Sequence, residues 1–307
     1  MRLVVALGGN ALLRRGETPG IATQREHLRE ATRSLAELAR AHDLVITHGN
    51  GPQVGLFASQ AESRGEAASL AEMGALSEGL IGFLLEQELR SALPEREIAA
   101  LLTLVAVDPA DPAFGQPRKT IGPIYPQKTG ERLARRRRWT MIPERDGLRR
   151  VVASPAPLRI LPLDAIRRLV DSRQIVVCAG GGGIPVFEDA SGWRGAEAVI
   201  DKDRTAALLA EGLRADGLVL LTDVSGVCEG FGTKDARLLR ELTPRELGER
   251  AFDPGSMGPK VEAACRFVER TGGWAAIGAL EEASSVVAGT TGTRIALPRI
   301  AEPALAR

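Results

Sequence analysis

Short apolar runs that alternate with helical patterns constrain the fold of this chain more than any other feature. Most of the runs are continuously apolar, which is typical of parallel strands that are covered on both faces. Strands that alternate with helices predict an α/β protein with a mainly parallel open sheet in three layers. The six predicted strands are residues 3–7, 44–47, 98–107, 175–179, 218–222 and 274–280.

Helical patterns fill the stretches between these runs. Thr23 and Glu26 are spaced for a capping box at the start of one helix. Thr243 and Glu246 are spaced for a second capping box, with Pro244 at the first helical position. The predicted helices are residues 23–41, 69–93, 204–213 and 256–270, together with one that begins at 243.

Composition excludes several classes of protein. The 307 residues are 44% hydrophobic and 26% charged, which suits a sizeable core in one large domain or two lobes. A net charge of +1 argues against a general nucleic-acid surface. Cys178, Cys228 and Cys265 are far apart and indicate reduced thiols in a cytoplasmic protein. No stretch reaches the ~18 apolar residues of a membrane span, so we expect neither nucleic acid nor a membrane as partner.

Residues 108–157 break the alternation of strands and helices. This segment is rich in Pro, Gly and Arg, and it predicts an insertion that projects from the sheet. It contains four consecutive arginines, residues 135–138. The run is compatible with a nucleic-acid patch or with a solvated face, and the near-zero net charge favours the solvated face.

Glycine-rich loops follow three of the predicted strands. Ligands of open α/β sheets bind at the carboxyl ends of strands, and glycine lets backbone N–H groups surround an anion there. A single such loop would indicate only a tight turn, but three favour a phosphate site. None of them matches the P-loop or the dinucleotide-binding motif. The loops are Gly8-Gly9-Asn10, His48-Gly49-Asn50-Gly51-Pro52 and residues 180–183, which include Gly181 and Gly182.

Three lysines are candidates to bind an anion at these loops. Lys202 lies between Asp201 and Asp203 at the start of a predicted helix, and Lys260 lies in the first turn of another. A cation there opposes the helix dipole unless an anion binds, although an exposed helix start with local ion pairs has the same sequence. Lys119 lies in the insertion. Three cations and three glycine loops suit phosphoryl transfer, which depends on positioning and charge neutralisation.

The candidate site has no obvious general base. The chain has three histidines, of which His48 borders a glycine loop and is interpreted as structural. A missing base suits an acceptor that is already ionised at neutral pH, such as a carboxylate, better than a hydroxyl.

These residues resemble the carbamate kinase family. The resemblance runs from residue 3 to about 296, and the segment around Lys119 with its Asp-Pro-Ala-Asp-Pro lead-in points to carbamate kinases within the wider amino-acid kinase family. Residues 116–123 (QPRKTIGP) lack one proline of the family's usual NPTKPIGP. The matching segments are residues 5–10, 47–55, 107–112, 119–123, 154–155, 180–185, 198–203 and 255–257.

The resemblance implies a fold and a reaction. The fold is a three-layer α/β/α sandwich around a sheet of about eight strands, with a protruding subdomain at about 112–157. Residues 1–215 are expected to form the acceptor lobe and residues 216–307 the nucleotide-binding lobe. The reaction is reversible phosphoryl transfer between ATP and carbamate, giving ADP and carbamoyl phosphate. Mg²⁺ accompanies the nucleotide, and the enzyme is a cytoplasmic homodimer.

The resemblance also implies roles for individual residues. Lys119, Lys202 and Lys260 match the catalytic lysines, and Asp203 matches the aspartate that orients the flanking lysines, whereas Asp201 is interpreted as a helix cap. The residues expected to bind the phosphoryl group and the acceptor are Gly8, Gly9, Asn10, Gly49, Asn50, Gly51, Gly181 and Gly182. Binding of the nucleotide falls to Thr222, Asp223, Gly255, Ser256 and Met257.

Two other functions remain open from the sequence. One is a related kinase with another acceptor, such as acetylglutamate or a nucleoside monophosphate. The other is a nucleotide-sensing module without catalysis, although binding alone would not require Lys119 on the acceptor side.

Overall fold

The computed structural model describes residues 1–9, 17, 20–50, 53–54, 57, 69–253 and 255–298. Its centre is an eight-stranded sheet in the order β15-β17-β16-β12-β1-β2-β9-β3. All neighbouring strands are parallel except β16 and β17. The prediction of a mainly parallel sheet of about eight strands is therefore confirmed. The strands are β1 (Arg2–Leu7), β2 (Asp43–His48), β3 (Ile98–Ala100), β9 (Ile175–Val177), β12 (Gly217–Thr222), β15 (Glu241–Leu242), β16 (Trp274–Ala279) and β17 (Thr293–Ile295).

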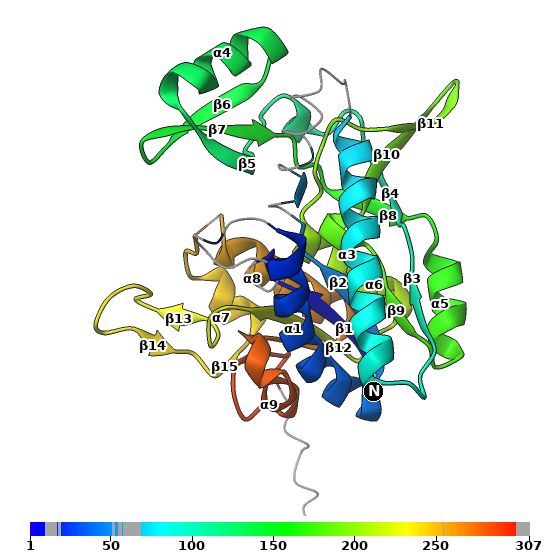
Figure 1. The fold of residues 1–307 in the computed structure, drawn as a ribbon. Coiled ribbons are helices and arrows are strands. Elements are labelled where there is room, and N and C mark those ends of the chain that lie inside the picture. The colour runs from blue at the N-terminus through cyan, green and yellow to red at the C-terminus, as the bar shows by residue number, and fades with distance from the viewer. Residues whose placement is uncertain are drawn as a thin grey trace, which may run out of the picture.

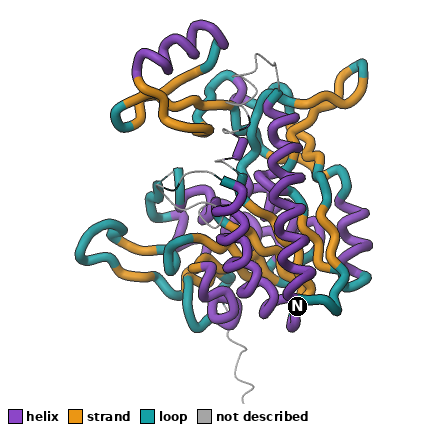
Figure 2. The backbone as a smooth tube through the Cα atoms, in the orientation of Figure 1, coloured by secondary structure: helices purple, strands orange, loops and turns teal. Residues whose placement is uncertain are grey.

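Helices cover both faces of this sheet, as Figures 1 and 2 show. Strand β1 is continuously apolar because both of its faces are buried. Leu3 and Val5 pack into one core, and Val4 and Ala6 pack into the other. The first core contains side chains of α1 (Ile21–Ala41), α3 (Leu70–Ala92) and α9 (Ala283–Ala288). The second contains side chains of α5 (Leu163–Asp171), α6 (Lys202–Leu213), α7 (Pro244–Gly248) and α8 (Met257–Thr271). The predicted three-layer arrangement is confirmed.

The single strand predicted over residues 98–107 is wrong, because two strands of different sheets occupy this run. Strand β3 lies in the large sheet, whereas β4 (Leu104–Val107) lies in a four-stranded sheet of order β11-β10-β4-β8. Thr103 marks the change: its N–H donates to Glu78 at 3.2 Å and its hydroxyl accepts from Ala179 N at 2.8 Å. Both halves are largely apolar, so the sequence pattern hides the break. The other strands of this sheet are β8 (Pro157–Ile160), β10 (Ile184–Asp189) and β11 (Gly192–Gly195).

The helix starts test the predicted caps. Helix α1 begins at Ile21 after an extended Gly20 that makes no side-chain cap, so the capping box predicted for Thr23 and Glu26 is wrong. Thr23 lies inside the first turn. The capping box of Thr243 and Glu246 is confirmed at the start of α7. Helix α3 also begins with a capping box, formed by Ser69 and Glu72.

The predicted insertion forms a subdomain that projects from the body, at the top of Figure 1. It has its own three-stranded sheet, β5-β7-β6, and one helix. Arg135, Arg136 and Arg138 are exposed at the end of that helix, where basic residues complement the helix dipole. Its elements are β5 (Lys119–Pro126), α4 (Gln127–Arg137), β6 (Thr140–Glu144) and β7 (Gly147–Val152).

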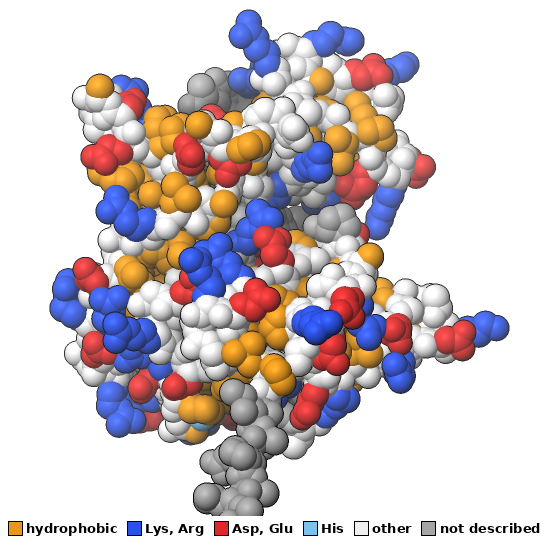
Figure 3. Space-filling view, turned by 180° about the vertical axis from the view of Figure 1, so that it is seen from behind, with side chains coloured by type: hydrophobic (Ala, Val, Ile, Leu, Met, Phe, Trp, Pro, Cys, Tyr) orange, Lys and Arg blue, Asp and Glu red, His pale blue; other side chains and the backbone are white. Residues whose placement is uncertain are grey.

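The molecular surface mixes charges of both signs. Basic and acidic side chains are interspersed over the face seen in Figure 3. Within the described residues, no helix is long and apolar enough to cross a membrane.

Candidate active site

The predicted site residues meet in one cavity of about 1020 Å³ at the carboxyl ends of the central strands. Strand register explains this, because Leu7 at the end of β1 lies between Leu221 of β12 and His48 of β2. The loops that follow these strands therefore emerge side by side. The predicted residues that line the cavity are Gly8, Gly9, Gly49, Asn50, Lys119, Gly181, Lys202, Asp203, Thr222, Asp223, Gly255, Ser256, Met257 and Lys260.

Three predicted residues are exceptions. Gly182 is buried but does not line the cavity. A Cβ at this position would lie 2.5 Å from the carbonyl oxygen of Ile200, so Gly182 permits close packing beneath the segment that carries Asp201. Asn10 and Gly51 lie outside the described residues.

Two glycines are required by close backbone approach. Gly49 N donates to Leu7 O at 3.0 Å, and a Cβ on Gly49 would lie 2.9 Å from the Cα of Gly9. Gly181 has a φ of +66°, and a Cβ there would lie 1.9 Å from the amide nitrogen of Asn50. The first and second loops thus touch through Gly9 and Gly49, and the second and third through Asn50 and Gly181.

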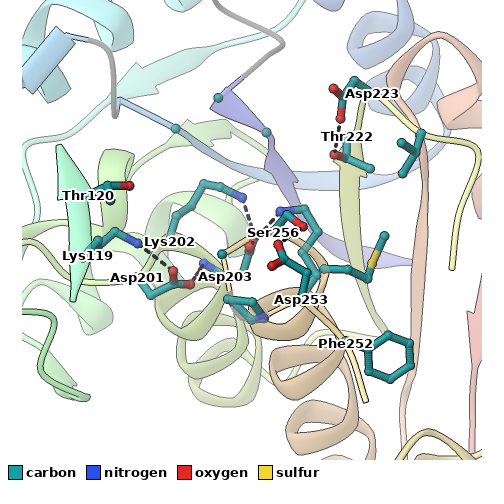
Figure 4. A pocket seen from close by; sticks show the side chains of 18 of the residues that line it. Lys119, Thr120, Asp201, Lys202, Asp203, Thr222, Asp223, Phe252, Asp253 and Ser256 are labelled. Atoms are coloured by element: carbon teal, nitrogen blue, oxygen red, sulfur yellow. Dashed lines mark hydrogen bonds and ion pairs between the residues drawn. The ribbon is translucent and has the colours of Figure 1, made fainter. Parts of the chain in front are cut away.

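The three lysines converge on two aspartates. Figure 4 labels Lys119 and Lys202 with both aspartates. Lys202 and Lys260 both contact the carboxylate of Asp203. Nζ of Lys260 lies 3.1 Å from Oδ2 of Asp203. Lys119, from the subdomain, contacts Asp201 at 2.7 Å from Nζ to Oδ2. Three cations against two anions leave this cluster with a net charge of +1, which suits an anionic ligand.

Burial sets the electrostatics of this cluster. The Lys202 side chain is 10% exposed and that of Asp203 is 6% exposed. Burial lowers the pKa of Lys202, and the neighbouring Asp203 carboxylate offsets part of that shift. For Asp203 burial opposes the charged form, but Lys202 and Lys260 outweigh it and lower the pKa of this carboxyl. Asp203 is therefore an anion shared by two lysines.

Both body lysines lie at helix N-termini, as predicted. Asp201 is the N-cap of α6, and its Oδ1 accepts from Asp203 N at 2.9 Å and from Arg204 N at 3.3 Å. Lys260 lies in the first turn of α8. The two helices are also joined by ion pairs, Arg204 with Glu262 at 3.0 Å and Arg266 with Glu211 at 2.9 Å. The packing of α6 against α8 fixes the positions of Lys202 and Lys260 relative to each other.

Sequence reasoning missed a layer of polar groups behind the glycine loops. Glu78 of α3 accepts from Gly180 N at 2.9 Å and from Thr103 N at 3.2 Å, and burial raises the pKa of Glu78 to about 8. Ser77 accepts from the amide of Asn50 at 2.7 Å. The available signal was a Ser-Glu pair on the otherwise apolar buried face of α3.

His48 belongs to the same layer. It is fully buried, and a Cβ at Gly180 would lie 2.2 Å from its ring. Burial lowers the pKa of His48 to about 4, so the ring is neutral at physiological pH. The wall of the cavity that comes from the part of the chain after residue 216 contains further residues without a predicted role, namely Cys228, Glu229, Phe231, Arg250, Phe252 and Asp253.

A three-layer α/β/α fold with glycine loops and a cationic cluster at the strand ends defines a phosphoryl-transferring enzyme. Comparison with known proteins agrees. A model of the amino acid kinase family matches residues 1–277. The chain belongs to the amino acid kinase family and, within it, groups with the carbamate kinases.

Three relatives illustrate the match. The chain is 48% identical over 301 residues to a carbamate kinase of Rhizobium meliloti (strain 1021), covering 96% of this chain and 93% of the relative. It is 48% identical over 299 residues to a carbamate kinase of Escherichia coli (strain K12), covering 96% and 99%. The structure of a Giardia lamblia carbamate kinase bound to AMP-PNP superimposes with a TM-score of 0.88 at 34% identity, covering 96% and 98%.

Proposed function

We propose that this protein is a carbamate kinase. It transfers the γ-phosphoryl group of ATP to an oxygen of carbamate, giving ADP and carbamoyl phosphate, and it also runs in reverse. A carbamate oxygen–phosphorus bond forms while the bond between the γ-phosphorus and the β–γ bridging oxygen breaks. The observation that carries this proposal is the convergence of Lys119, Lys202 and Lys260 on two aspartates beside glycine loops, in a chain whose relatives are carbamate kinases.

The lysines neutralise charge on the transferred group. Lys202 and Lys260 flank the phosphoryl group and Asp203 keeps both oriented, because it contacts each of them. Lys119 acts on the acceptor side, since it comes from the protruding subdomain and lines the cavity. Such charges are effective because the protein holds them in place before the reaction and no solvent reorganisation is needed.

The glycine loops hold the phosphoryl group and the acceptor. Gly8, Gly9, Gly49, Asn50 and Gly181 line the cavity, and the glycines among them let a bound anion approach the backbone closely. Gly8 N and Gly49 N themselves donate to the carbonyl oxygens of Leu221 and Leu7 and hold the loops in place. Gly182 supports this wall from behind. The proposal also includes Asn10 and Gly51, which follow Gly9 and Asn50 in the sequence. Carbamate is already an anion at neutral pH, so the reaction requires no general base.

The nucleotide occupies the lobe formed by residues 216–307. Thr222, Asp223, Gly255, Ser256 and Met257 line the cavity on that side and support this placement. The AMP-PNP complex of the Giardia lamblia relative agrees with a site for ATP. Mg²⁺ would enter with the nucleotide substrate and would neutralise part of its phosphate charge. Residues 1–215, with the subdomain at about 112–157, form the acceptor lobe.

We also infer a homodimer. Leu76 and Phe83 of α3 are 56% and 54% exposed, and Leu102 is 57% exposed. Gly79 lies between Leu76 and Phe83 on the same face of α3, and a Cβ at this position would lie 3.7 Å from the Leu102 side chain. The three apolar side chains therefore belong to one exposed surface. An apolar surface of this kind favours association with a second copy. Leu76→Asp combined with Phe83→Asp is expected to give monomers in light scattering, and an unchanged mass would exclude this face.

The enzyme is assigned to the cytoplasm. Its three cysteines are all unpaired thiols, and Cys178 is buried. A reducing compartment keeps thiols in this state.

A coupled ATP assay tests the function. Purified protein with Mg²⁺, ADP and carbamoyl phosphate is expected to form ATP. Acetylglutamate and UMP with ATP serve as the control acceptors. Activity with either of these and none with carbamoyl phosphate would identify a different kinase of the family. ATP binding without any turnover would identify a nucleotide-sensing module.

A further inference from the structure

We propose that Asp201 is a positioning residue that seats the protruding subdomain on the body and aims Lys119 at the phosphoryl-transfer site. This role goes beyond that of a helix cap. It rests on the proposed carbamate kinase activity for its catalytic consequence, but its structural part stands on the contacts of Asp201 alone.

The two oxygens of the Asp201 carboxylate face two different parts of the molecule (Figure 4). Oδ1 caps α6 by accepting from the backbone N–H groups of Asp203 and Arg204. Oδ2 accepts from Nζ of Lys119 at 2.7 Å. The cap requires only an oxygen acceptor, whereas the ion pair requires the negative charge. The two tasks are therefore separable by substitution.

Apolar contacts and a backbone hydrogen bond surround this ion pair. Ile121 and Val199, each two residues from a member of the pair, pack into one cluster of buried side chains. Val199 N donates to the carbonyl oxygen of Ala153, the residue that follows the last strand of the subdomain, at 3.0 Å. Because strand β5 begins at Lys119, the ion pair lies where the subdomain sheet meets the body. Asp201 and Val199 thus form neighbouring contacts that attach the subdomain to the body.

Exposure separates this lysine from the other two. The side chain of Lys119 is 30% exposed, against 10% for Lys202 and 13% for Lys260. An ion pair that solvent reaches is screened, so an anionic ligand competes for it more easily than for a buried pair. Asp201 therefore holds Lys119 at the acceptor side before substrate binds and releases it to the arriving anion. Lys202 and Lys260 remain bound to Asp203 throughout.

The substitution Asp201→Asn tests this role. Asparagine caps a helix as well as aspartate does, but it carries no charge for Lys119. We expect a thermal midpoint close to that of the wild-type protein and a fall of about tenfold in kcat/KM for carbamoyl phosphate. Asp164→Asn, which removes an exposed surface pair with Arg167, is the matched control and is expected to change neither quantity.

A double-mutant cycle with Lys119→Met separates positioning from any other effect of Asp201. If Asp201 acts through Lys119, adding Asp201→Asn to Lys119→Met lowers kcat/KM no further. An equal fold-loss in both backgrounds would overturn the proposal, and so would unchanged kinetics of Asp201→Asn alone.

Amide hydrogen exchange supplies a readout that does not depend on the reaction. Without substrate, the peptide covering residues 119–126 is expected to exchange several-fold faster in Asp201→Asn than in the wild-type protein. Unchanged exchange would overturn the seating role. If the wild-type protein makes no ATP from carbamoyl phosphate, the proposed function fails, but this exchange comparison still decides the role of Asp201.

Discussion

The cationic cluster has two halves that are built differently. In the body half, Lys202 and Lys260 lie on packed helices and share the buried Asp203. In the subdomain half, Lys119 lies at the start of a separate small sheet and contacts Asp201.

The difference concerns how easily each half changes its contacts. Breaking a buried pair leaves an uncompensated buried charge and costs about 3–5 kcal/mol, whereas a pair whose lysine is partly open to solvent is screened and costs less to break. The body half is therefore suited to stabilise charge in one fixed geometry. The subdomain half is suited to exchange its partner when substrate binds and leaves. Four predictions test this contrast.

Loss of Lys202 is expected to have the largest effect. Lys202→Met keeps an unbranched apolar stem but removes the buried charge, and kcat is expected to fall about 1,000-fold. The measurement is the initial rate of ATP formation from carbamoyl phosphate and ADP. Lys128→Met, on the exposed face of α4, is the control and is expected to leave the rate unchanged. A loss below about tenfold would show that the body half does not supply the main electrostatic stabilisation.

Loss of the shared aspartate is expected to reduce stability. Asp203→Asn leaves Lys202 and Lys260 without their common anion, and the free energy of unfolding is expected to fall by about 3 kcal/mol. Urea denaturation at pH 7 measures this value. Asp201→Asn is the comparison, with an expected change below about 1 kcal/mol because its partner is more exposed. Equal losses in the two variants would remove the distinction between the halves.

Loss of Lys119 is expected to affect activity and leave stability nearly unchanged. Lys119→Met is expected to lower kcat/KM for carbamoyl phosphate about 100-fold, because one cation of the transfer site is lost. The free energy of unfolding is expected to stay within about 1 kcal/mol, since the pair is partly exposed. Parallel kinetics and urea denaturation test both statements, and a stability loss as large as that of Asp203→Asn would contradict them.

The buried His48, which lies behind the glycine loops, is expected to make the stability of the protein depend on pH. Burial lowers the pKa of His48 from 6.5 to about 4. Between these values the unfolded chain binds a proton that the folded protein does not, so acid favours unfolding. His48 is expected to cost the wild-type protein about 2 kcal/mol at pH 5 relative to pH 7. His48→Gln should lose that much less over the same range in urea denaturation, and an identical pH dependence would refute the assignment.

Sequence patterns predicted much of the fold because it depends on local periodicity. The continuously apolar strands and the capping box of Thr243 and Glu246 were recognised correctly. The change of sheet at Thr103 was not, since pairing with Glu78 and Ala179 involves residues far away in the sequence. The cap of α1 was misplaced because Gly20 begins the helix through its backbone alone.

The candidate site divides in the same way. The sequence by itself determined which residue types were available, namely glycine loops after strands and lysines at helix starts, because these signals lie within a few residues. Only the tertiary structure decided that Lys119 contacts Asp201 across 82 positions. It also gave the contacts of Lys202 and Lys260 with Asp203, whose orienting role the family resemblance had implied. It also placed Glu78 behind Gly180. The physical reason is that strand register and helix packing, which set these distances, arise from burial of surfaces that are remote from one another along the chain.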